Sequence, residues 1–251
     1  MTGGVADWGI RTSQVSGLEN QIMTQVAALE PLGHRKVGEI AASLAGATAV
    51  FRRFRIDFCC HGDVLLDEAA KARGIDPRTI EAALQELDGA PPSDLPSDTA
   101  GLIDHILERY HETHRRQLPE LIQLSRRVEQ VHAGKPGVPA GLAEILQHAL
   151  GELEVHMRKE ELMIFPAMRR TDVTRLLDGP TAMLREDHSD QGAMLEQITA
   201  MTDDFTVPEG ACATWQALYA GAAEFKQDLV EHIHIENNIL FPRFESSAIP
   251  A

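Results

Sequence analysis

Several features that define large classes of proteins are missing from this sequence. Only three cysteines occur among 251 residues, which is typical of a reducing compartment and not of a disulfide scaffold. No run of about 18 apolar residues occurs, so we expect no transmembrane helix. The N-terminus, MTGGVADWGIRTSQ, has no basic segment followed by an apolar one, so we expect no secretory signal. These absences predict a cytoplasmic protein.

An excess of basic residues is also missing, because the formal net charge is −15. Nucleic acids and anionic membranes attract basic faces, so we expect neither as a partner. Aromatic residues make up only 5% of the chain, whereas Ala, Leu, Glu, Gln and Arg are abundant. The abundant residues favour helices, and the composition predicts an all-α fold.

Proline and glycine divide the chain into four parts. The clearest break contains three prolines among Asp and Ser, which cannot continue a helix. The predicted parts are an N-terminal extension (1–33, with a short helix at 18–30), a small helical domain (34–88), a linker (89–98) and a helical bundle (99–245). In the small domain a helix is expected over 64–73 with Gly74 as its C-cap, and Asp76 should N-cap the next helix, with Pro77 at its first position.

Four long segments with helical periodicity occupy the C-terminal part. They cover residues 99–132, 139–169, 181–202 and 211–244, and short segments that contain Pro or Gly separate them. Long helices with short connections favour an antiparallel four-helix bundle.

Two segments of this bundle share an unusual pattern. HMRKEELMIFP (156–166) and HIHIENNILFP (232–242) both read H-x-x-x-E-x-x-x-x-F-P. Residues four apart lie on one face of a helix, so each histidine projects beside its glutamate. The pairs are His156 with Glu160 and His232 with Glu236.

Two more histidines precede these pairs at almost equal intervals. His111 comes before His156 by nearly the same number of residues as His188 comes before His232. The bundle therefore consists of two similar helical hairpins, which indicates an internal duplication. Because the legs of an antiparallel hairpin nearly cancel in length, all four imidazoles and both carboxylates should lie at one level.

This set of side chains predicts two iron ions in the bundle. Imidazole favours first-row transition metals, and a carboxylate can bridge two of them. In the simplest arrangement each iron has two histidines, while Glu160, Glu236 and an oxo group bridge the pair. Ferritin-type sites use Glu-x-x-His and more carboxylates, so histidine-rich pairs in the opposite order disfavour that class.

The remaining polar residues of the bundle sort by their distance from these pairs. His132 lies about 31 Å along one helix from His111, too far to join the same site. Three residues could surround the ligands: His114, Glu161 and Asp187. Three more point away from them or serve in packing: His105, His148 and His234.

The small domain carries a pair of adjacent cysteines, Cys59 and Cys60, within DFCCHGD (57–63). We expect them at a turn that leads into a helix, where the pKa of a thiol falls and its reactivity rises. Adjacent cysteines do not readily form a relaxed disulfide, so the pair could act in thiol exchange or bind a metal. Cys212 is expected to be a buried helix residue.

These motifs together resemble one known family. DFCC, RYHETHRRQLPEL (109–121), HMRKEE (156–161) and EHIHIENNILFPR (231–243) are similar to the Repair of Iron Centers (RIC) family of di-iron proteins, over residues 34–245. That family joins a short domain with a DFCC or DYCC motif to a hemerythrin-like bundle. The chain differs from it by about 30 additional N-terminal residues and by His61, where glycine is commoner.

The resemblance implies a bacterial stress protein that repairs iron–sulfur clusters damaged by nitric oxide or oxidants, in which iron is supplied to the cluster. It places the histidine ligands at His111, His156, His188 and His232, the bridging carboxylates at Glu160 and Glu236, and the family's cysteines at Cys59 and Cys60. Damaged iron–sulfur proteins or their assembly scaffolds are the expected partners, and the chain could form a homodimer. Two alternative functions are reduction of nitric oxide at the two irons and hemerythrin-like binding or sensing of oxygen.

Overall fold

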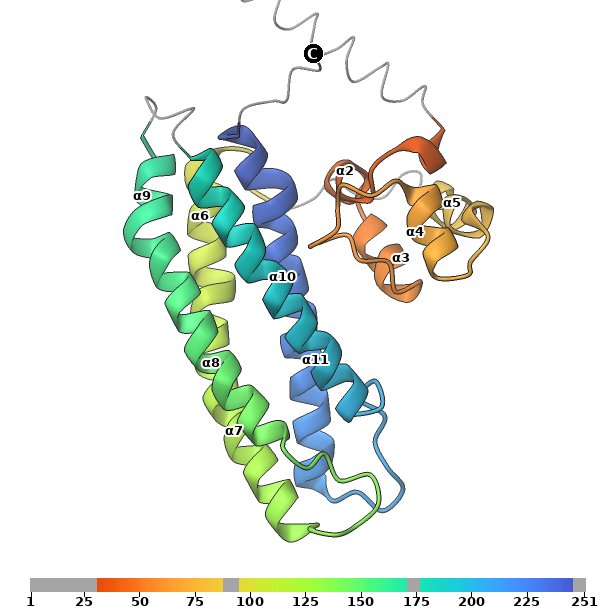
Figure 1. Cartoon of the computed structure of the whole chain (residues 1–251), viewed down its shortest axis with the longest axis vertical. Coiled ribbons are helices and arrows are strands. Elements are labelled where there is room, and N and C mark those ends of the chain that lie inside the picture. Colours follow the sequence, from red (N-terminus) through yellow and green to blue (C-terminus); the bar gives the residue numbers. More distant parts are fainter. Residues whose placement is uncertain (1–30, 88–94, 171–176, 246–251) are drawn as a thin grey trace, which may run out of the picture.

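The computed structural model describes residues 31–87, 95–170 and 177–245. These residues form a small helical domain that lies beside one half of a long four-helix bundle (Figure 1). The extended pairing in this part of the chain is a single isolated bridge between Lys36 and Leu65. The predicted all-α fold is confirmed, while the helix expected at 18–30 and most of the linker lie outside the described residues.

The small domain contains four short helices after a single 3₁₀ turn. In chain order they are η1 (Leu32–His34), α2 (Val37–Ser43), α3 (Ala47–Arg53), α4 (Leu66–Ala72) and α5 (Pro77–Gln85). Asp76 N-caps α5 as predicted, because its carboxylate accepts the backbone N–H of Arg78 at 3.0 Å. Helix α4 begins later than the expected position 64, since Leu65 is extended and paired with Lys36.

Each leg of the bundle is one nearly continuous helical rod. The first is α6 (Thr99–His105), η2 (Ile106–His111) and α7 (Glu112–Val131), and the second is α8 (Leu142–Lys159), η3 (Glu160–Ile164) and α9 (Phe165–Met168). The third is α10 (Asp178–Met201), and the fourth is α11 (Ala213–His234), η4 (Ile235–Leu240) and η5 (Phe241–Arg243). Pro180 was expected to precede the third rod but lies in its first turn, where a missing N–H breaks no helical bond.

Three of the four rods widen into a π-helical turn at the same level of the bundle. These turns are η2, η3 and η4, whereas α10 is uninterrupted. A proline follows η3 and η4 closely, at Pro166 and Pro242, and the loss of its N–H favours a local departure from α-helical bonding. Nothing comparable in the sequence explains η2. Such turns are frequent at functional sites, and here each one carries residues that we singled out from the sequence.

The apolar core of the bundle consists of two clusters with a polar layer between them. One cluster, which includes Phe51 and Phe58, joins the small domain to the half of the bundle in which α7 ends and α8 begins. The other fills the opposite end of the bundle around Leu102 and Phe241. Along the fourth rod, Ile233 belongs to the first cluster and Leu240 to the second, with Glu236 between them.

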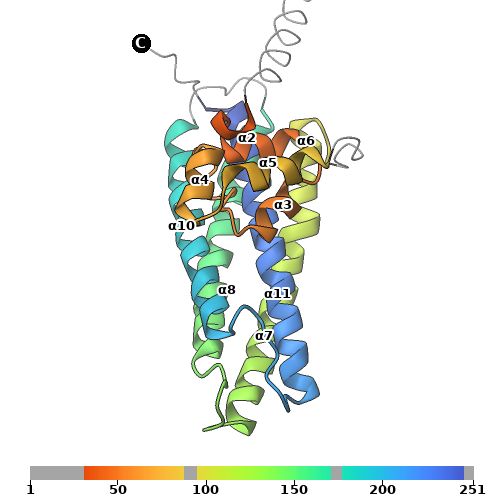
Figure 2. The same cartoon turned by 90° about the vertical axis from the view of Figure 1, so that its right-hand side faces the viewer.

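The small domain docks on the bundle where the fourth rod becomes π-helical, and it spans α10 and α11 in the view of Figure 2. Asn237 and Asn238 donate from their side-chain amides to the carbonyls of Cys59 and Phe58, both at 2.9 Å. Gly62 makes room for this contact, because a Cβ there would collide with Asn238 Oδ1. The amides hold the cysteine turn directly against the bundle.

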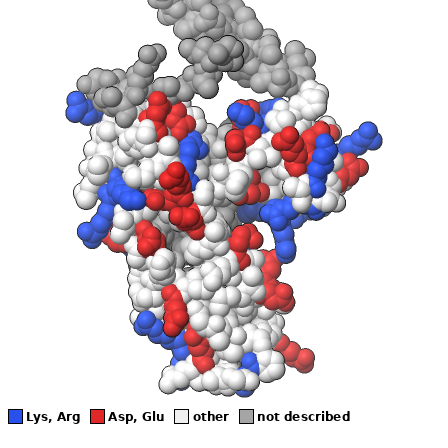
Figure 3. Space-filling model, in the orientation of Figure 1, with Lys and Arg blue, Asp and Glu red and all other residues white. Residues whose placement is uncertain are grey.

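The surface agrees with the composition. On the face in Figure 3, acidic and basic side chains are interspersed over the bundle and the small domain. Among the described residues, no helix has both the length and the apolar character needed to span a membrane.

Candidate metal centre

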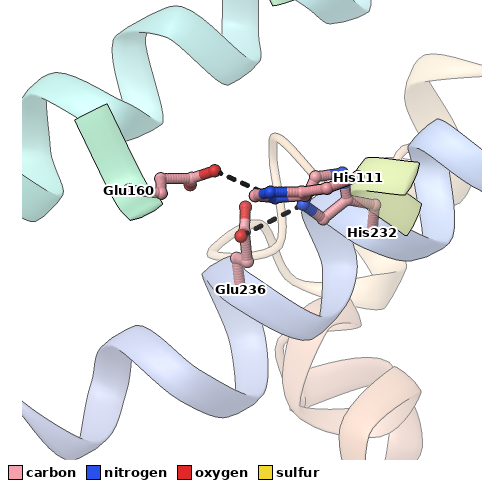
Figure 4. A group of neighbouring side chains, drawn as sticks. All are labelled: His111, Glu160, His232 and Glu236. Atoms are coloured by element: carbon pink, nitrogen blue, oxygen red, sulfur yellow. Dashed lines mark hydrogen bonds and ion pairs between the residues drawn. The ribbon is translucent and has the colours of Figure 1, made fainter. Parts of the chain in front are cut away.

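The polar layer of the bundle contains all six side chains that the sequence analysis proposed as metal ligands. Each is at most 2% exposed: His111, His156, His188, His232, Glu160 and Glu236. The three π turns carry His111, Glu160 and Glu236, while the other three histidines lie on regular helices. In Figure 4, Glu160 approaches from the second rod and faces His111, His232 and Glu236. Residues from all four rods therefore converge on one point.

The six side chains form two overlapping groups of four. We call the first subsite A (His111, His232 and both glutamates) and the second subsite B (His156, His188 and both glutamates). In each subsite the potential ligand atoms all lie within 4.8 Å of one another. The two glutamates are common to both groups.

Each glutamate directs one oxygen to each subsite. Glu160 places Oε2 3.3 Å from His111 Nε2 and Oε1 3.3 Å from His156 Nε2. Glu236 places Oε1 3.1 Å from His232 Nε2 and Oε2 3.1 Å from His188 Nε2. This division of oxygens is the geometry that a carboxylate needs to bridge two cations.

Several polar atoms at the centre have no hydrogen-bond partner among the described residues. They are both oxygens of Glu160, Oε2 of Glu236 and Nε2 of His111. The carboxylate oxygens lie 3.1–3.3 Å from imidazole nitrogens as ion pairs without hydrogen-bond geometry, and buried charges are normally paired or bound to a metal. The orphaned atoms, the imidazole and carboxylate chemistry and the two subsites all fit a pair of transition-metal ions.

The electrostatics of the layer favour bound cations. Burial and Glu236 raise the pKa of Glu160, but His156 and His111 outweigh them and hold it below its usual range. Burial also opposes the charge of Glu236, yet His188 and the other imidazoles lower its pKa. Burial lowers the pKa of His156, but the two glutamates more than offset this and raise it to about 9. Both carboxylates thus keep their negative charge despite burial, which favours bound cations in this layer.

Three of the four histidines are oriented by a hydrogen bond from the other ring nitrogen. The Nδ1 atoms of His111, His156 and His188 lie 2.8, 3.1 and 2.9 Å from Glu161, Asp187 and Asn237. Such partners fix the ring and leave Nε2 free to bind a metal ion. Glu161 and Asp187, whose roles the sequence left open, therefore each contact a proposed ligand. Glu161 also pairs with Arg115, and Asp187 pairs with Lys159.

The other histidines take positions outside the two subsites. His132 lies outside both subsites, as its distance from His111 along the helix predicted, and its Nε2 is 3.2 Å from Cys212 Sγ at the far end of the bundle. His114 is fully buried against the ring of His232, whose centroid is 5.4 Å away. His148 is largely exposed, and His234 packs on Phe58.

The structure corrects one prediction about the surroundings of Cys59 and Cys60 and one about the position of Cys212. Cys59 and Cys60 lie in a turn, but α4 begins only at Leu66, so the thiols do not lie at a helix N-terminus. The hydrogen bond shared with Cys60, together with burial, instead raises the pKa of the Cys59 thiol. Cys212 is not a buried helix residue, because it is exposed at the N-cap of α11.

Sequence reasoning missed Asn237, which contacts the proposed ligand His188. Its Oδ1 accepts from His188 Nδ1, while its Nδ2 donates to the carbonyl of Cys59. The signal was present in the repeat, because Glu161 and Asn237 both directly follow a proposed bridging glutamate. Each of them orients the histidine on the other leg of its own hairpin.

Comparisons with known proteins agree with this two-part structure. Residues 102–244 match the model of the hemerythrin HHE cation binding domain. Residues 33–88 match a domain of unknown function, DUF542.

Similar full-length relatives carry one name. The chain is 46% identical to the iron-sulfur cluster repair protein YtfE of Musicola paradisiaca over 212 residues, which cover 83% of this chain and 95% of the relative. Identity to the proteins of that name is 44% for Edwardsiella ictaluri and 43% for Dickeya chrysanthemi, each with 83% of this chain and 96% of the relative covered.

Proposed function

Because the chain belongs to the family of iron–sulfur cluster repair proteins with a hemerythrin HHE cation binding domain, we propose that it repairs clusters damaged by nitrosative or oxidative stress by donating iron. The observation that carries the proposal is the pair of subsites that share Glu160 and Glu236. Iron–sulfur proteins or their assembly scaffolds would be the recipients. Cytoplasmic location and a homodimer stay predictions from the sequence.

The residues divide the work between holding iron and releasing it. His111 and His232 would hold one ion in subsite A, and His156 and His188 the other in subsite B. Bound iron is the cargo, and it supplies the cation that a damaged cluster has lost. Glu160 and Glu236 provide two negative charges, whereas two divalent ions carry four positive charges. A deficit of ligand charge favours exchange of the ions over permanent retention.

The cysteine turn supports release from one side. Cys60 Sγ lies 3.3 Å from the backbone carbonyl of His188, so the thiols stand beside subsite B. We therefore propose that Cys59 and Cys60 act in transfer, and that they are not needed to hold the two ions in the bundle.

A repair assay with two double variants tests this division. The protein is purified without chelators, its iron is measured, and a purified [4Fe–4S] dehydratase inactivated by nitric oxide serves as recipient. We expect Cys59→Ser with Cys60→Ser to keep about two irons per chain and to reactivate the dehydratase poorly. Glu160→Gln with Glu236→Gln should lose both iron and repair.

Two results would contradict the proposal. Zinc alone, or no metal, in the wild-type protein would remove the iron centre, and full repair by the cysteine variant would remove the thiol role. Nitrous oxide is measured in the same anaerobic reaction, and catalytic turnover of nitric oxide without dehydratase reactivation would favour the alternative function.

A further inference from the structure

The cysteine turn brings together a second set of metal-binding atoms outside the bundle. Cys59 Sγ lies 3.5 Å from Cys60 Sγ and 3.4 Å from Asp57 Oδ1. The ligand atoms of these three residues all lie within 4.8 Å of one another.

These separations match the edges of a small coordination tetrahedron. In tetrahedral zinc sites, bond lengths of about 2.3 Å to sulfur and about 2.0 Å to oxygen imply about 3.7 Å between two sulfurs and about 3.5 Å between sulfur and oxygen. The observed distances of 3.5 and 3.4 Å come close to both values. A cation could therefore enter with little movement of the side chains.

Hydrogen bonds hold the carboxylate of Asp57 and the backbone of Cys59 in place. The second carboxylate oxygen of Asp57 is paired with His61 Nδ1 at 2.6 Å, which orients the first oxygen toward the thiols. The backbone N–H of Cys60 donates to that first oxygen at 3.0 Å. Asn237 fixes the carbonyl of Cys59, so the turn cannot move freely away from the bundle. Hydrogen bonds of this kind to metal-binding groups support affinity.

A cavity gives access to the turn. It has a volume of about 590 Å³, and its walls come from the small domain and from α10 and α11. Asp57, Cys59, Cys60 and His61 all line it, and Cys60 is partly exposed. Three protein ligands beside an open cavity leave a fourth position free, which is characteristic of sites that exchange or act on a ligand and not of closed structural sites.

We propose that Asp57, Cys59 and Cys60 form a second metal site, for a thiophilic divalent cation such as Zn²⁺ or Fe²⁺, separate from the two subsites of the bundle. Thiolates select such ions over Mg²⁺ and Ca²⁺. The existence of this site does not depend on the proposed function. Its proposed use rests on that function, under which Fe²⁺ that leaves subsite B binds here before it passes to a recipient.

Cobalt(II) is the probe, because thiolate–cobalt coordination gives a charge-transfer absorption that the His and Glu ligands of the bundle cannot produce. The full chain, reduced with a phosphine, is titrated with Co²⁺ under anaerobic conditions. We expect one thiolate-bound Co²⁺ per chain in addition to bundle-bound ions. Cys59→Ser with Cys60→Ser should abolish the band, and Asp57→Ala should weaken Co²⁺ binding by about tenfold or more.

Two matched variants make the result decisive. Cys212→Ser removes the third thiol, at the far end of the bundle, and should leave the band unchanged. Glu160→Gln with Glu236→Gln should reduce the bundle-bound Co²⁺ and leave the thiolate band in place. Helical circular dichroism and bundle-bound Co²⁺ in the cysteine variant establish that it has folded.

The proposal fails if the wild-type protein shows no thiolate band at saturating Co²⁺, or if the band survives in the folded cysteine variant. Neither result would bear on iron binding by the bundle or on the repair activity. Conversely, a bundle that holds no iron would overturn the proposed function while the thiolate band persisted.

Discussion

Subsites A and B are related by the internal duplication, yet their surroundings differ. In subsite B both imidazoles donate to an acceptor, His156 to Asp187 and His188 to Asn237. In subsite A only His111 does so, and Nδ1 of His232 has no partner among the described residues. The repeat therefore conserves the ligand types but not the groups that orient them.

The difference arises at one pair of equivalent positions. Asp187 precedes His188, and Tyr110 precedes His111. Asp187 accepts from His156, whereas Tyr110 stacks on His232, with ring centroids 5.4 Å apart and planes within 5°. A hydrogen-bonded acceptor raises the basicity of an imidazole ligand and a stacked ring does not, so we expect subsite B to bind a divalent ion more tightly than subsite A.

The largest effect is expected from a substitution that weakens both subsites together. Glu160→Gln takes one negative charge from both subsites, so affinity should fall on the order of 100-fold or more in each, beyond what loss of an outer partner costs. Metal content per chain, measured after gel filtration, should drop from two ions to less than one. His148→Gln, on the exposed surface of α8, is the control. Retention of one tightly held ion would show that Glu160 does not bridge.

The next variant should affect one subsite only. Asn237→Ala removes the acceptor of His188 and should weaken subsite B by about 10–100-fold while subsite A is unchanged. Asn238→Ala is a matched control, because it also loses a hydrogen bond to the cysteine turn but touches neither subsite. Anaerobic Fe²⁺ titration should resolve two steps, of which only the tighter one moves in Asn237→Ala. An equal shift in both variants would mean that docking of the small domain, and not orientation of His188, is responsible.

A paired substitution sharpens the contrast between acceptor and stacked ring. Asp187→Ala should weaken subsite B by about tenfold, because His156 loses its acceptor. Tyr110→Phe keeps the stacked ring on His232 and should change Fe²⁺ affinity in subsite A less than about twofold, since no hydrogen bond from the phenol to the ligand is lost. Comparable losses in the two variants would contradict the inequivalence of the subsites.

The last comparison is between Cys59, in the cysteine turn beside subsite B, and Cys212, at the far end of the bundle. The backbone N–H of Trp215 lowers the pKa of the exposed Cys212, whereas the Cys60 hydrogen bond and burial raise that of Cys59. The thiolate is the reactive form, so Cys212 should react with iodoacetamide faster than Cys59. Peptide mass spectrometry over time measures both rates. Faster alkylation of Cys59 would show that the turn opens away from the bundle.

The sequence predicted most of the fold because periodicity and capping are local. The four rods lie close to the expected ranges, and Asp76 caps α5 as its place before Pro77 required. The convergence of the six proposed ligands also followed from spacing, since a hairpin whose legs cancel needs no further tertiary information.

Features that depend on contacts between distant segments could not be read in the same way. The proximity of Cys60 to His188 and the bond from Asn237 to Cys59 join the two domains, and no periodicity encodes them. The raised pKa of Cys59 likewise depends on its hydrogen bond with Cys60 and on burial in the folded protein. Cys212 was misplaced because the start of α11 lies two residues after the predicted one, at Ala213.

The three π turns also change the rotational phase of the rods that contain them. Each turn accommodates about one residue more than an α-helical turn, so the side chains beyond it are rotated by about 100° relative to a regular helix. The third rod, α10, has no such turn and keeps a single phase along its length. A heptad-like pattern read through His111, Glu160 or Glu236 would assign the wrong face to every residue on one side. Alignments of related bundles must therefore allow an insertion at the polar layer and treat the helical segments on its two sides as separate registers.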